Sequence, residues 1–180
     1  MIIVVAGNGS NSGKTTLIRV ILSLYPGMFD VAKLTPSDRL KSAIEVDESE
    51  LLKGDKDTAF FMREGARKVV WIHGKAKDIG SLLKSSLAQL GDNIVIEGNS
   101  ALRCIKPDLT FFIVREPGST VNKSAALAES MADYIILNKT SVNYSRSGNI
   151  LNISLLKALA DPGKFADELS KILRKFKEFM

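Results

Sequence analysis

A stretch of ten residues, GNGSNSGKTT at 7–16, constrains this chain more than any other part of the sequence. It follows an apolar run at 1–6 and precedes apolar residues at helical spacing, namely Leu17, Ile18, Ile21 and Leu22. A buried strand, a turn rich in glycine and small polar residues, and then a helix together build a phosphate-binding loop. The backbone N–H groups of such a turn and the N-terminus of the helix form a concavity that accepts phosphate oxygens. The stretch therefore predicts a nucleotide site.

The spacing inside this loop departs from the usual G-x-x-x-x-G-K-[ST] pattern, because Asn8 stands where the first glycine belongs. The loop can be read from Gly7, with five residues before Gly13, or from Gly9, with three. In both cases Lys14 is expected to reach the β- and γ-phosphates and to be a catalytic residue. The residues expected to hold the nucleotide are Gly9, Ser10, Asn11, Ser12, Gly13, Lys14, Thr15 and Thr16.

Glu97 is the second candidate catalytic residue. It ends the apolar run 94–96 and is followed by a glycine. A carboxylate at the tip of a buried strand beside a phosphate loop can hold Mg²⁺ directly or through water. Without a cation, a charge at that depth would be costly. The Thr15 hydroxyl stands where phosphate loops supply a ligand to Mg²⁺, so Thr15 and Glu97 are the expected metal-binding residues.

A polar element follows the predicted strand 134–137. Its sequence, Asn138-Lys139-Thr140-Ser141, resembles the N-K-x-D base-reading element of GTPases. Asn138 would hydrogen-bond a purine, and the stem of Lys139 would cover its face. Ser141 replaces the aspartate that accepts hydrogens from guanine, so the sequence leaves the base open. Either ATP or GTP, together with Mg²⁺, is the expected ligand.

Weaker signals surround this predicted site. Lys33 ends the second predicted strand, where it could meet a phosphate or an anionic small-molecule substrate. The irregular segment 36–57 is either a mobile loop that faces the substrate or a plain connector with a short helix near 51–52. Asp55 and Asp57 could serve as a catalytic base or a Mg²⁺ partner, but the interpretation favoured here is that they cap the next helix.

The order of apolar segments predicts an α/β fold. Short, nearly continuous apolar strands that alternate with helices indicate a parallel sheet with helices on both faces, and hence three layers. A single P-loop domain over residues 1–180 is expected, with its ligand at the carboxyl ends of the strands. The strands are predicted at 1–6, 28–35, 69–72, 93–97, 109–114 and 134–137, helices after the phosphate loop and at 57–68, 78–90, 122–131 and 161–176, a loop at 141–149, and a short apolar segment at 150–159.

Composition and charge limit the classes of protein to which the chain can belong. With 45% hydrophobic and 25% charged residues the chain matches soluble proteins, and no apolar run approaches the roughly 20 residues of a membrane helix. The net charge of +5 is spread along the chain, which suits a nucleotide and does not indicate nucleic-acid binding. Cys104, the single cysteine, has no partner motif and suits a reducing cytosol, so a cytoplasmic location is expected. His73, the single histidine, is expected to be a hydrogen-bonded residue at a strand end.

Three of these elements, in this order, resemble the MobB-type molybdopterin-guanine dinucleotide biosynthesis accessory proteins. They are the loop 7–16, the stretch Gly54-Asp55-Lys56-Asp57-Thr58 leading to Arg63-Glu64-Gly65-Ala66, and the strand Ile94-Val95-Ile96-Glu97-Gly98. The resemblance covers roughly residues 1–115. It implies a Mg²⁺-dependent nucleoside triphosphate-binding protein with slow hydrolysis and an accessory role in cofactor biosynthesis. Residues 13–16 would then bind the nucleotide and Glu97 would lie at the Mg²⁺ site.

Other functions remain open. The spacing from Gly7 and the Glu-Gly strand end are also similar to those of dethiobiotin synthetase and cobyrinic acid amidase-type domains, which implies an ATP-dependent small-molecule kinase or ligase. A nucleotide-controlled switch or metal-delivery module is a third alternative. The expected partners are the nucleotide, an anionic small molecule or a cofactor-biosynthesis enzyme, and a homodimer is compatible with the sequence.

Overall fold

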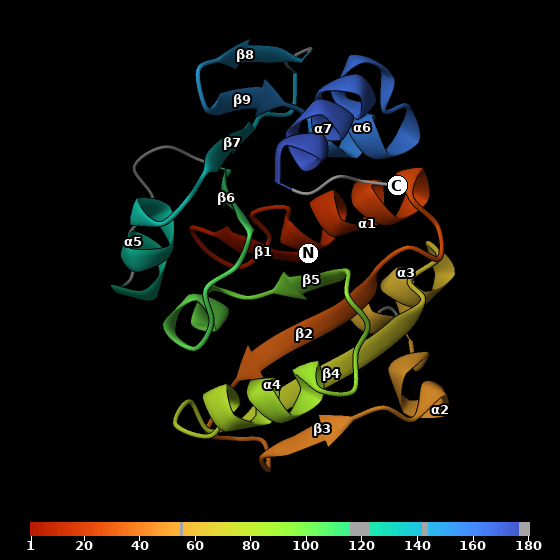
Figure 1. Cartoon of the computed structure of the whole chain (residues 1–180), viewed down its shortest axis with the longest axis vertical. Coiled ribbons are helices and arrows are strands. Elements are labelled where there is room, and N and C mark those ends of the chain that lie inside the picture. Colours follow the sequence, from red (N-terminus) through yellow and green to blue (C-terminus); the bar gives the residue numbers. More distant parts are fainter. Residues whose placement is uncertain (55, 116–122, 142–143, 177–180) are drawn as a thin grey trace.

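A single mixed sheet forms the middle of the molecule in the computed structural model, which describes residues 1–54, 56–115, 123–141 and 144–176 (Figure 1). Within these ranges the sheet has nine strands in the order β3-β4-β2-β5-β1-β6-β7-β9-β8. The strands are β1 (Ile2–Gly7), β2 (Asp30–Pro36), β3 (Ala43–Glu45), β4 (Lys68–Gly74), β5 (Ile94–Glu97), β6 (Leu109–Val114), β7 (Tyr134–Asn138), β8 (Ser145–Ser147) and β9 (Ile150–Ile153).

The seven inner strands run parallel, and the two edge strands run against their neighbours. β1 lies between β5 and β6, with Val4 opposite Ile96 on one side and Thr110 on the other. β3 pairs antiparallel with β4, and β8 pairs antiparallel with β9. Because the inner strands are parallel, their carboxyl ends meet along one edge of the sheet, which is where ligands bind in such folds.

Helices cover both faces of the sheet, and each face has its own hydrophobic core. One core joins the sheet to α1 (Lys14–Leu24), α2 (Glu48–Leu51), α3 (Asp57–Arg63), α6 (Leu155–Ala160) and α7 (Gly163–Phe176). The other joins it to α4 (Ile79–Leu87), the 3₁₀ helix η1 (Asn99–Arg103) and α5 (Lys123–Ser130). Figure 1 shows the two groups on opposite sides of the sheet, with α5 at the left and α1, α6 and α7 at the right.

The predicted three-layer α/β architecture is confirmed, and six predicted strands correspond to β1, β2, β4, β5, β6 and β7. Three further strands were not predicted. β3 lies inside the irregular segment 36–57, β8 lies in the predicted loop 141–149, and the apolar segment 150–159 divides into β9 and α6. β3 and β8 have three residues each, and pairing with a longer neighbour, not their own pattern, makes them strands. The short helix expected near 51–52 is α2.

A partly buried ion pair between Asp30 and Arg67 fixes the start of β2. The Asp30 carboxylate accepts hydrogen bonds from Arg67 Nε (2.8 Å), Arg67 Nη2 (2.9 Å) and the Gly91 N–H (2.6 Å). The Asp30 side chain is 3% exposed, whereas that of Arg67 is 46% exposed. Burial alone would raise the pKa of Asp30, but the hydrogen bonds from Arg67 and Gly91 outweigh it and hold the pKa below its usual value. These hydrogen bonds connect the start of β2 to the residue before β4 and to the turn before β5.

Replacing Asp30 with Ala is expected to lower the free energy of unfolding by about 2–3 kcal/mol, because the partly buried Gly91 N–H loses its acceptor and Arg67 loses its partner. The pKa of Asp30 is depressed in the folded protein, so this stabilisation is fully present above the unfolded value of about 4. It is lost as the pH falls through the folded pKa. Urea unfolding between pH 2.5 and 7 should therefore show the difference between the two proteins shrinking below about pH 4.

Glu50→Ala provides the control, since Glu50 makes an ion pair with Lys53 in which both side chains are largely exposed. Its cost should stay below about 1 kcal/mol. Equal free energies of unfolding of Asp30→Ala and the unchanged protein at pH 7 would contradict the stabilising role of the Asp30 hydrogen bonds.

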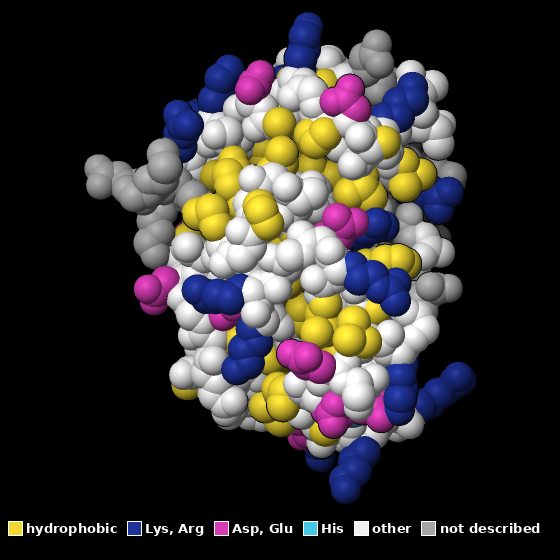
Figure 2. Space-filling model, turned by 90° about the vertical axis from the view of Figure 1, so that its right-hand side faces the viewer, with side chains coloured by type: hydrophobic (Ala, Val, Ile, Leu, Met, Phe, Trp, Pro, Cys, Tyr) yellow, Lys and Arg dark blue, Asp and Glu magenta, His cyan; other side chains and the backbone are white. Residues whose placement is uncertain are grey.

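Hydrophobic, basic and acidic side chains are intermixed on the side of the molecule that carries α1, α6 and α7. Figure 2 shows this face, where basic and acidic groups alternate with hydrophobic ones. Large hydrophobic side chains exposed in the described parts of the chain include Val46, Leu52, Leu127, Met131 and Leu156. Across the described ranges, none of the helices combines the length and the apolar character required to cross a bilayer.

Candidate nucleotide-binding site

The turn between β1 and α1 leaves no room for a side chain at two of its glycines. A Cβ added to Gly7 would lie 2.4 Å from Ser12 Oγ and 3.0 Å from the Ile113 carbonyl oxygen. Gly13 has a φ of 111°, and a Cβ there would lie 2.6 Å from Asn138 Nδ2. A Cβ at Gly9, in contrast, would meet no atom of the described residues within 4 Å. Packing therefore requires glycine at Gly7 and Gly13, which favours reading the loop from Gly7 with five intervening residues.

The 3₁₀ helix η1 and the strand β6 hold this loop by its backbone. The Gly7 N–H donates to Asn99 Oδ1 (2.9 Å), and Asn99 Nδ2 donates to the Gly7 carbonyl (3.0 Å). The Asn8 N–H donates to the Ile113 carbonyl (3.0 Å). Asn11 is in the left-handed region with a φ of 59°, a conformation that asparagine tolerates better than most residues. Sequence reasoning missed Asn99, whose only signal is its position two residues after Glu97.

Lys14 folds back over the loop. Its ammonium donates to the Gly9 carbonyl (2.7 Å) and to Ser12 Oγ (3.4 Å). Burial lowers the pKa of Lys14, while the nearby carboxylate of Glu97 acts in the opposite direction. An ammonium in partly desolvated surroundings gains more from an added anion than one in water does. The geometry therefore suits a phosphate group in front of the loop.

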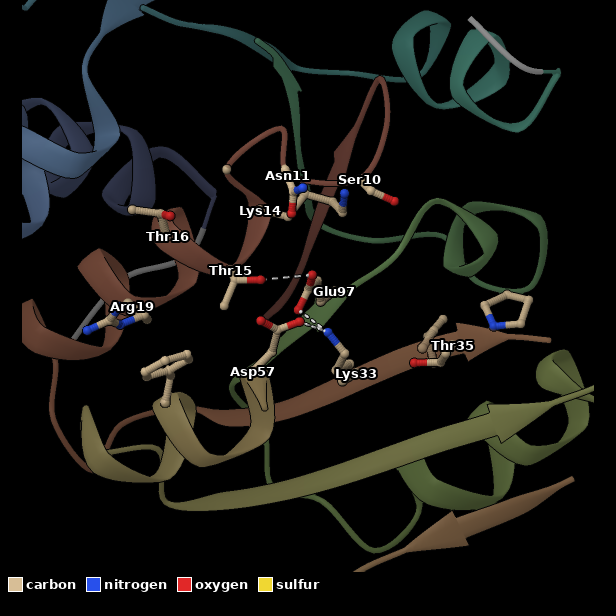
Figure 3. A pocket seen from close by; sticks show the side chains of 14 residues that line it. Ser10, Asn11, Lys14, Thr15, Thr16, Arg19, Lys33, Thr35, Asp57 and Glu97 are labelled. Carbon is tan, nitrogen blue, oxygen red and sulfur yellow. Dashed lines mark hydrogen bonds and ion pairs between the residues drawn. The ribbon is translucent and has the colours of Figure 1, made fainter. Parts of the chain in front are cut away.

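Four side chains meet beside Lys14, as Figure 3 shows. Thr15 Oγ1 donates to Glu97 Oε1 (3.2 Å), and Lys33 Nζ lies 3.3 Å from Glu97 Oε2. Lys33 also makes an ion pair with Asp57. Glu97 is 6% exposed, and burial raises its pKa even though Lys33 and Lys14 act against the shift. A buried carboxylate with a raised pKa is a group whose charge would be stabilised by a further cation.

This donor set fits Mg²⁺. A threonine hydroxyl and a carboxylate are hard oxygen ligands, and Mg²⁺ is commonly held by one or two carboxylates together with phosphate oxygens and water. Thr15 and Glu97 supply these groups at the N-terminus of α1 and the carboxyl end of β5, and Asp57 is the second carboxylate nearby. No cluster of three or more histidine, cysteine, aspartate or glutamate residues suited to a metal occurs in the described ranges. Mg²⁺ held by Thr15 and Glu97 would complete its coordination with water or with phosphate oxygens.

The prediction that Asp57 caps α3 is wrong. Lys56 occupies the N-cap position without a side-chain cap hydrogen bond, and Asp57 is the first residue of the helix. Its carboxylate turns toward Lys33 and Glu97, which makes it part of the site (Figure 3). Asp55, the other cap candidate, lies outside the described residues.

A cavity of about 660 Å³ opens in front of the loop. Its lining includes residues that sequence reasoning did not single out, such as Arg19 and Phe60. Arg19 donates to Glu64 (2.6 Å) and lies 4.6 Å from the Phe60 ring centroid. The predicted nucleotide- and metal-binding residues that line this cavity are Ser10, Asn11, Gly13, Lys14, Thr15, Thr16 and Glu97, and the weaker candidates Lys33 and Asp57 line it as well. Gly9 and Ser12 contact Lys14 from within the loop.

A second cavity, of about 520 Å³, lies on the other side of Gly13. Its lining includes Asn138 and Lys139, and it shares Asn11, Gly13 and Thr16 with the first cavity. Asn138 Nδ2 donates to the Ser12 carbonyl (2.9 Å), and Asn138 Oδ1 accepts from the Leu155 N–H (3.1 Å). Asn138 thus joins the loop to the start of α6. Its second amide N–H is not used by these two bonds, so a contact with a base stays a prediction.

His73 and Cys104 are not among the residues that line the two cavities. The expectation that His73 is hydrogen-bonded does not hold for its Nδ1, which is buried and has no hydrogen-bond partner among the residues that the structure describes. The imidazole instead lies against Trp71, with 4.3 Å between ring centroids. Cys104 is a free cysteine whose Sγ contacts the Ser100 carbonyl (3.4 Å).

Comparison with solved structures finds the same architecture in a nucleotide complex. LpxK from Aquifex aeolicus, in complex with ATP, superimposes with a TM-score of 0.54 at 15% sequence identity. The match covers 84% of this chain and 53% of that one, so this chain spans about half the length of LpxK. The chain has the P-loop NTPase fold. The kinase domain of Escherichia coli tyrosine kinase ETK gives a TM-score of 0.40 at 18% identity, over 81% of this chain and 71% of that one. No family model and no curated protein matches the sequence.

Proposed function

We propose that the protein binds a nucleoside triphosphate with Mg²⁺ and cleaves its terminal phosphate slowly. The observation that carries this is the placement of Lys14, Thr15 and Glu97 around one cavity at the carboxyl ends of β1 and β5. The ATP complex of LpxK, a protein of the same fold, supports it.

Each of the residues has a role in this proposal. The loop amides and Lys14 hold and neutralise the phosphates, and Thr15 and Glu97 hold Mg²⁺, which spreads the negative charge that develops on the phosphate oxygens. Asn138 and Lys139 line the cavity on the far side of Gly13, where a base attached to phosphates in the loop would lie. Ser141 in that lining gives no carboxylate for guanine, so ATP and GTP are both candidates.

A thermal-shift panel tests the proposal. The protein is melted alone and with ATP, GTP, ADP or GDP, each with Mg²⁺ or with EDTA. At a ligand concentration of about 100 times the Kd, binding adds about 2.7 kcal/mol of stability. For a chain of this size that is a rise of about 5–10 °C in Tm. The triphosphate should give the larger shift with Mg²⁺ than with EDTA. Identical melting curves under all conditions would overturn the proposal.

A second candidate function is phosphoryl transfer to a small molecule. The observation that favours it is Asp57, a carboxylate that lines the 660 Å³ cavity beside Lys33 and could accept a proton from a hydroxyl. Turnover that rises strongly when an acceptor is added would support transfer. A flat, low rate of hydrolysis would support the first function.

The cellular role is proposed from the sequence resemblance alone. The three elements shared with the MobB-type proteins support an accessory role in molybdenum-cofactor biosynthesis, with an enzyme of that pathway as the partner. Deleting the gene in its host should then lower the activity of molybdenum enzymes. Unchanged activity of those enzymes would rule this role out without affecting the proposal on nucleotide binding.

A further inference from the structure

A smaller cavity, of about 310 Å³, continues from the nucleotide cavity between α3, β2 and β4. Three residues, Lys33, Thr35 and Asp57, line both cavities. A molecule in the smaller cavity would therefore reach side chains that also line the 660 Å³ cavity in front of the loop. The remaining lining residues are Lys56, Thr58 and Trp71.

Trp71 forms a fixed flat wall of this cavity. Its indole N–H donates to Thr35 Oγ1 (2.9 Å), which sets the orientation of the ring. The His73 ring lies 4.3 Å from it, and Lys56 Nζ lies 5.4 Å from its centroid. A cation–π contact at an exposed site is weak, so the flexible Lys56 side chain can give way to a ligand. An indole held in one orientation is suited to stack against another flat ring.

The charges around this wall are mixed. Lys33 and Lys56 bring two ammonium groups to the cavity lining, and Asp57 brings one carboxylate, which is already paired with Lys33. Lys56 is exposed, and in the described ranges no ion pair involves it. The cavity therefore has an ammonium available for an anionic group close to the stacking surface.

We propose that this cavity binds the acceptor of the phosphoryl group, a small molecule with a flat ring, an anionic group and a hydroxyl. The inference rests on phosphoryl transfer as the function of the adjoining site. The ring stacks on Trp71, the anion meets Lys56, and the hydroxyl lies toward Asp57. In the transfer, Asp57 takes the hydroxyl proton and the acceptor oxygen forms a bond to the γ-phosphorus. The bond from that phosphorus to the β–γ bridging oxygen breaks, and the nucleoside diphosphate leaves with the electron pair.

The test uses Trp71 as its own reporter, because it is the only tryptophan in the sequence. Three probes of similar size are titrated against the full chain: 3-hydroxybenzoate, 3-hydroxycyclohexanecarboxylate, which lacks the flat ring, and 3-hydroxybenzyl alcohol, which lacks the charge. Free N-acetyltryptophanamide corrects for absorption and collisional quenching. For a fragment of about ten heavy atoms, saturation on the order of millimolar is expected. The first probe should quench Trp71 saturably, with a Kd at least threefold lower than that of either analogue.

Two lysine variants distinguish binding of the probe in the cavity from a general electrostatic attraction to the protein. Lys56→Gln should raise the Kd of 3-hydroxybenzoate about three- to fivefold, because one exposed ammonium is lost. The Kd of 3-hydroxybenzyl alcohol should stay the same. Lys53 is a nearby exposed lysine that does not line the cavity, so Lys53→Gln should change neither Kd. Equal affinity of the three probes, or equal weakening in both variants, would overturn the inference.

A parallel measurement distinguishes this inference from the function on which it rests. If MgATP raises the Tm and no probe quenches Trp71 saturably, the acceptor site is wrong and nucleotide binding stands. If no nucleotide raises the Tm, the proposed function fails, and the acceptor role fails with it. Quenching by 3-hydroxybenzoate together with its phosphorylation in the presence of MgATP would support both.

Discussion

Replacing Lys14 with Ala is expected to weaken the binding of MgATP by at least about 100-fold, because charge-assisted hydrogen bonds to the phosphates are lost in a partly desolvated cavity. The loop itself should survive. The Lys14 ammonium carries a pKa lowered by burial, so its removal relieves a desolvation cost in the free protein. We therefore expect the Tm without ligand to stay the same or rise slightly. Isothermal titration with MgATP measures the affinity.

Two variants complete that experiment. Lys84→Ala removes an exposed lysine from α4, on the opposite face of the sheet, and should bind MgATP as the unchanged protein does. Lys14→Arg keeps the charge but brings a larger planar group, and should recover only part of the affinity. Unchanged affinity of Lys14→Ala would remove the phosphate-binding role of the loop.

Replacing Glu97 with Gln is the second change with a large expected effect. The substitution keeps the shape and removes the charge, so Mg²⁺ loses an anionic ligand and Lys33 loses one of its two carboxylates. We expect the Mg²⁺-dependent part of the ATP-induced rise in Tm to disappear. The hydrolysis rate should fall by about 10²–10³, the cost of losing one group that stabilises transition-state charge. ATP in EDTA should still bind, since the loop amides and Lys14 remain.

Glu129→Gln is the matched control, because Glu129 is an exposed residue of α5 away from the cavity lining. It should leave the response to Mg²⁺ and the rate unchanged. A Glu97→Gln variant with the full response to Mg²⁺ would show that this carboxylate does not serve the metal.

The sequence could predict that the loop 7–16 and Glu97 lie together because their signals are local. Each depends on a strand followed directly by a glycine turn or a carboxylate, and parallel strands bring such ends to one edge. Asp57 could not be assigned in the same way. A carboxylate at the start of a helix suits both a cap and an ion pair, and only the position of Lys33 on β2 decides between them.

Asn99 and the extra strands were beyond sequence reasoning for a related reason. An asparagine after Glu97-Gly98 has the signal of an ordinary turn, and its bidentate contact with Gly7 exists only because β1 and β5 are adjacent. β9 belongs to an apolar run that continues into α6, and the cap at Ser154 separates the two elements. Such features depend on which segments the fold places side by side.

The contacts of Asn138 restrict where the segment between β7 and α6 can change in length. One amide group connects the phosphate loop at Ser12 with the first turn of α6 at Leu155, segments more than 120 positions apart in the sequence. A shift of α6 would therefore be transmitted directly to the backbone of the loop at Ser12. Insertions between β7 and α6 are best tolerated in the outer β8–β9 turn, where Gly148 has open space around it. Loop length there can change while the two ends of the connection stay fixed.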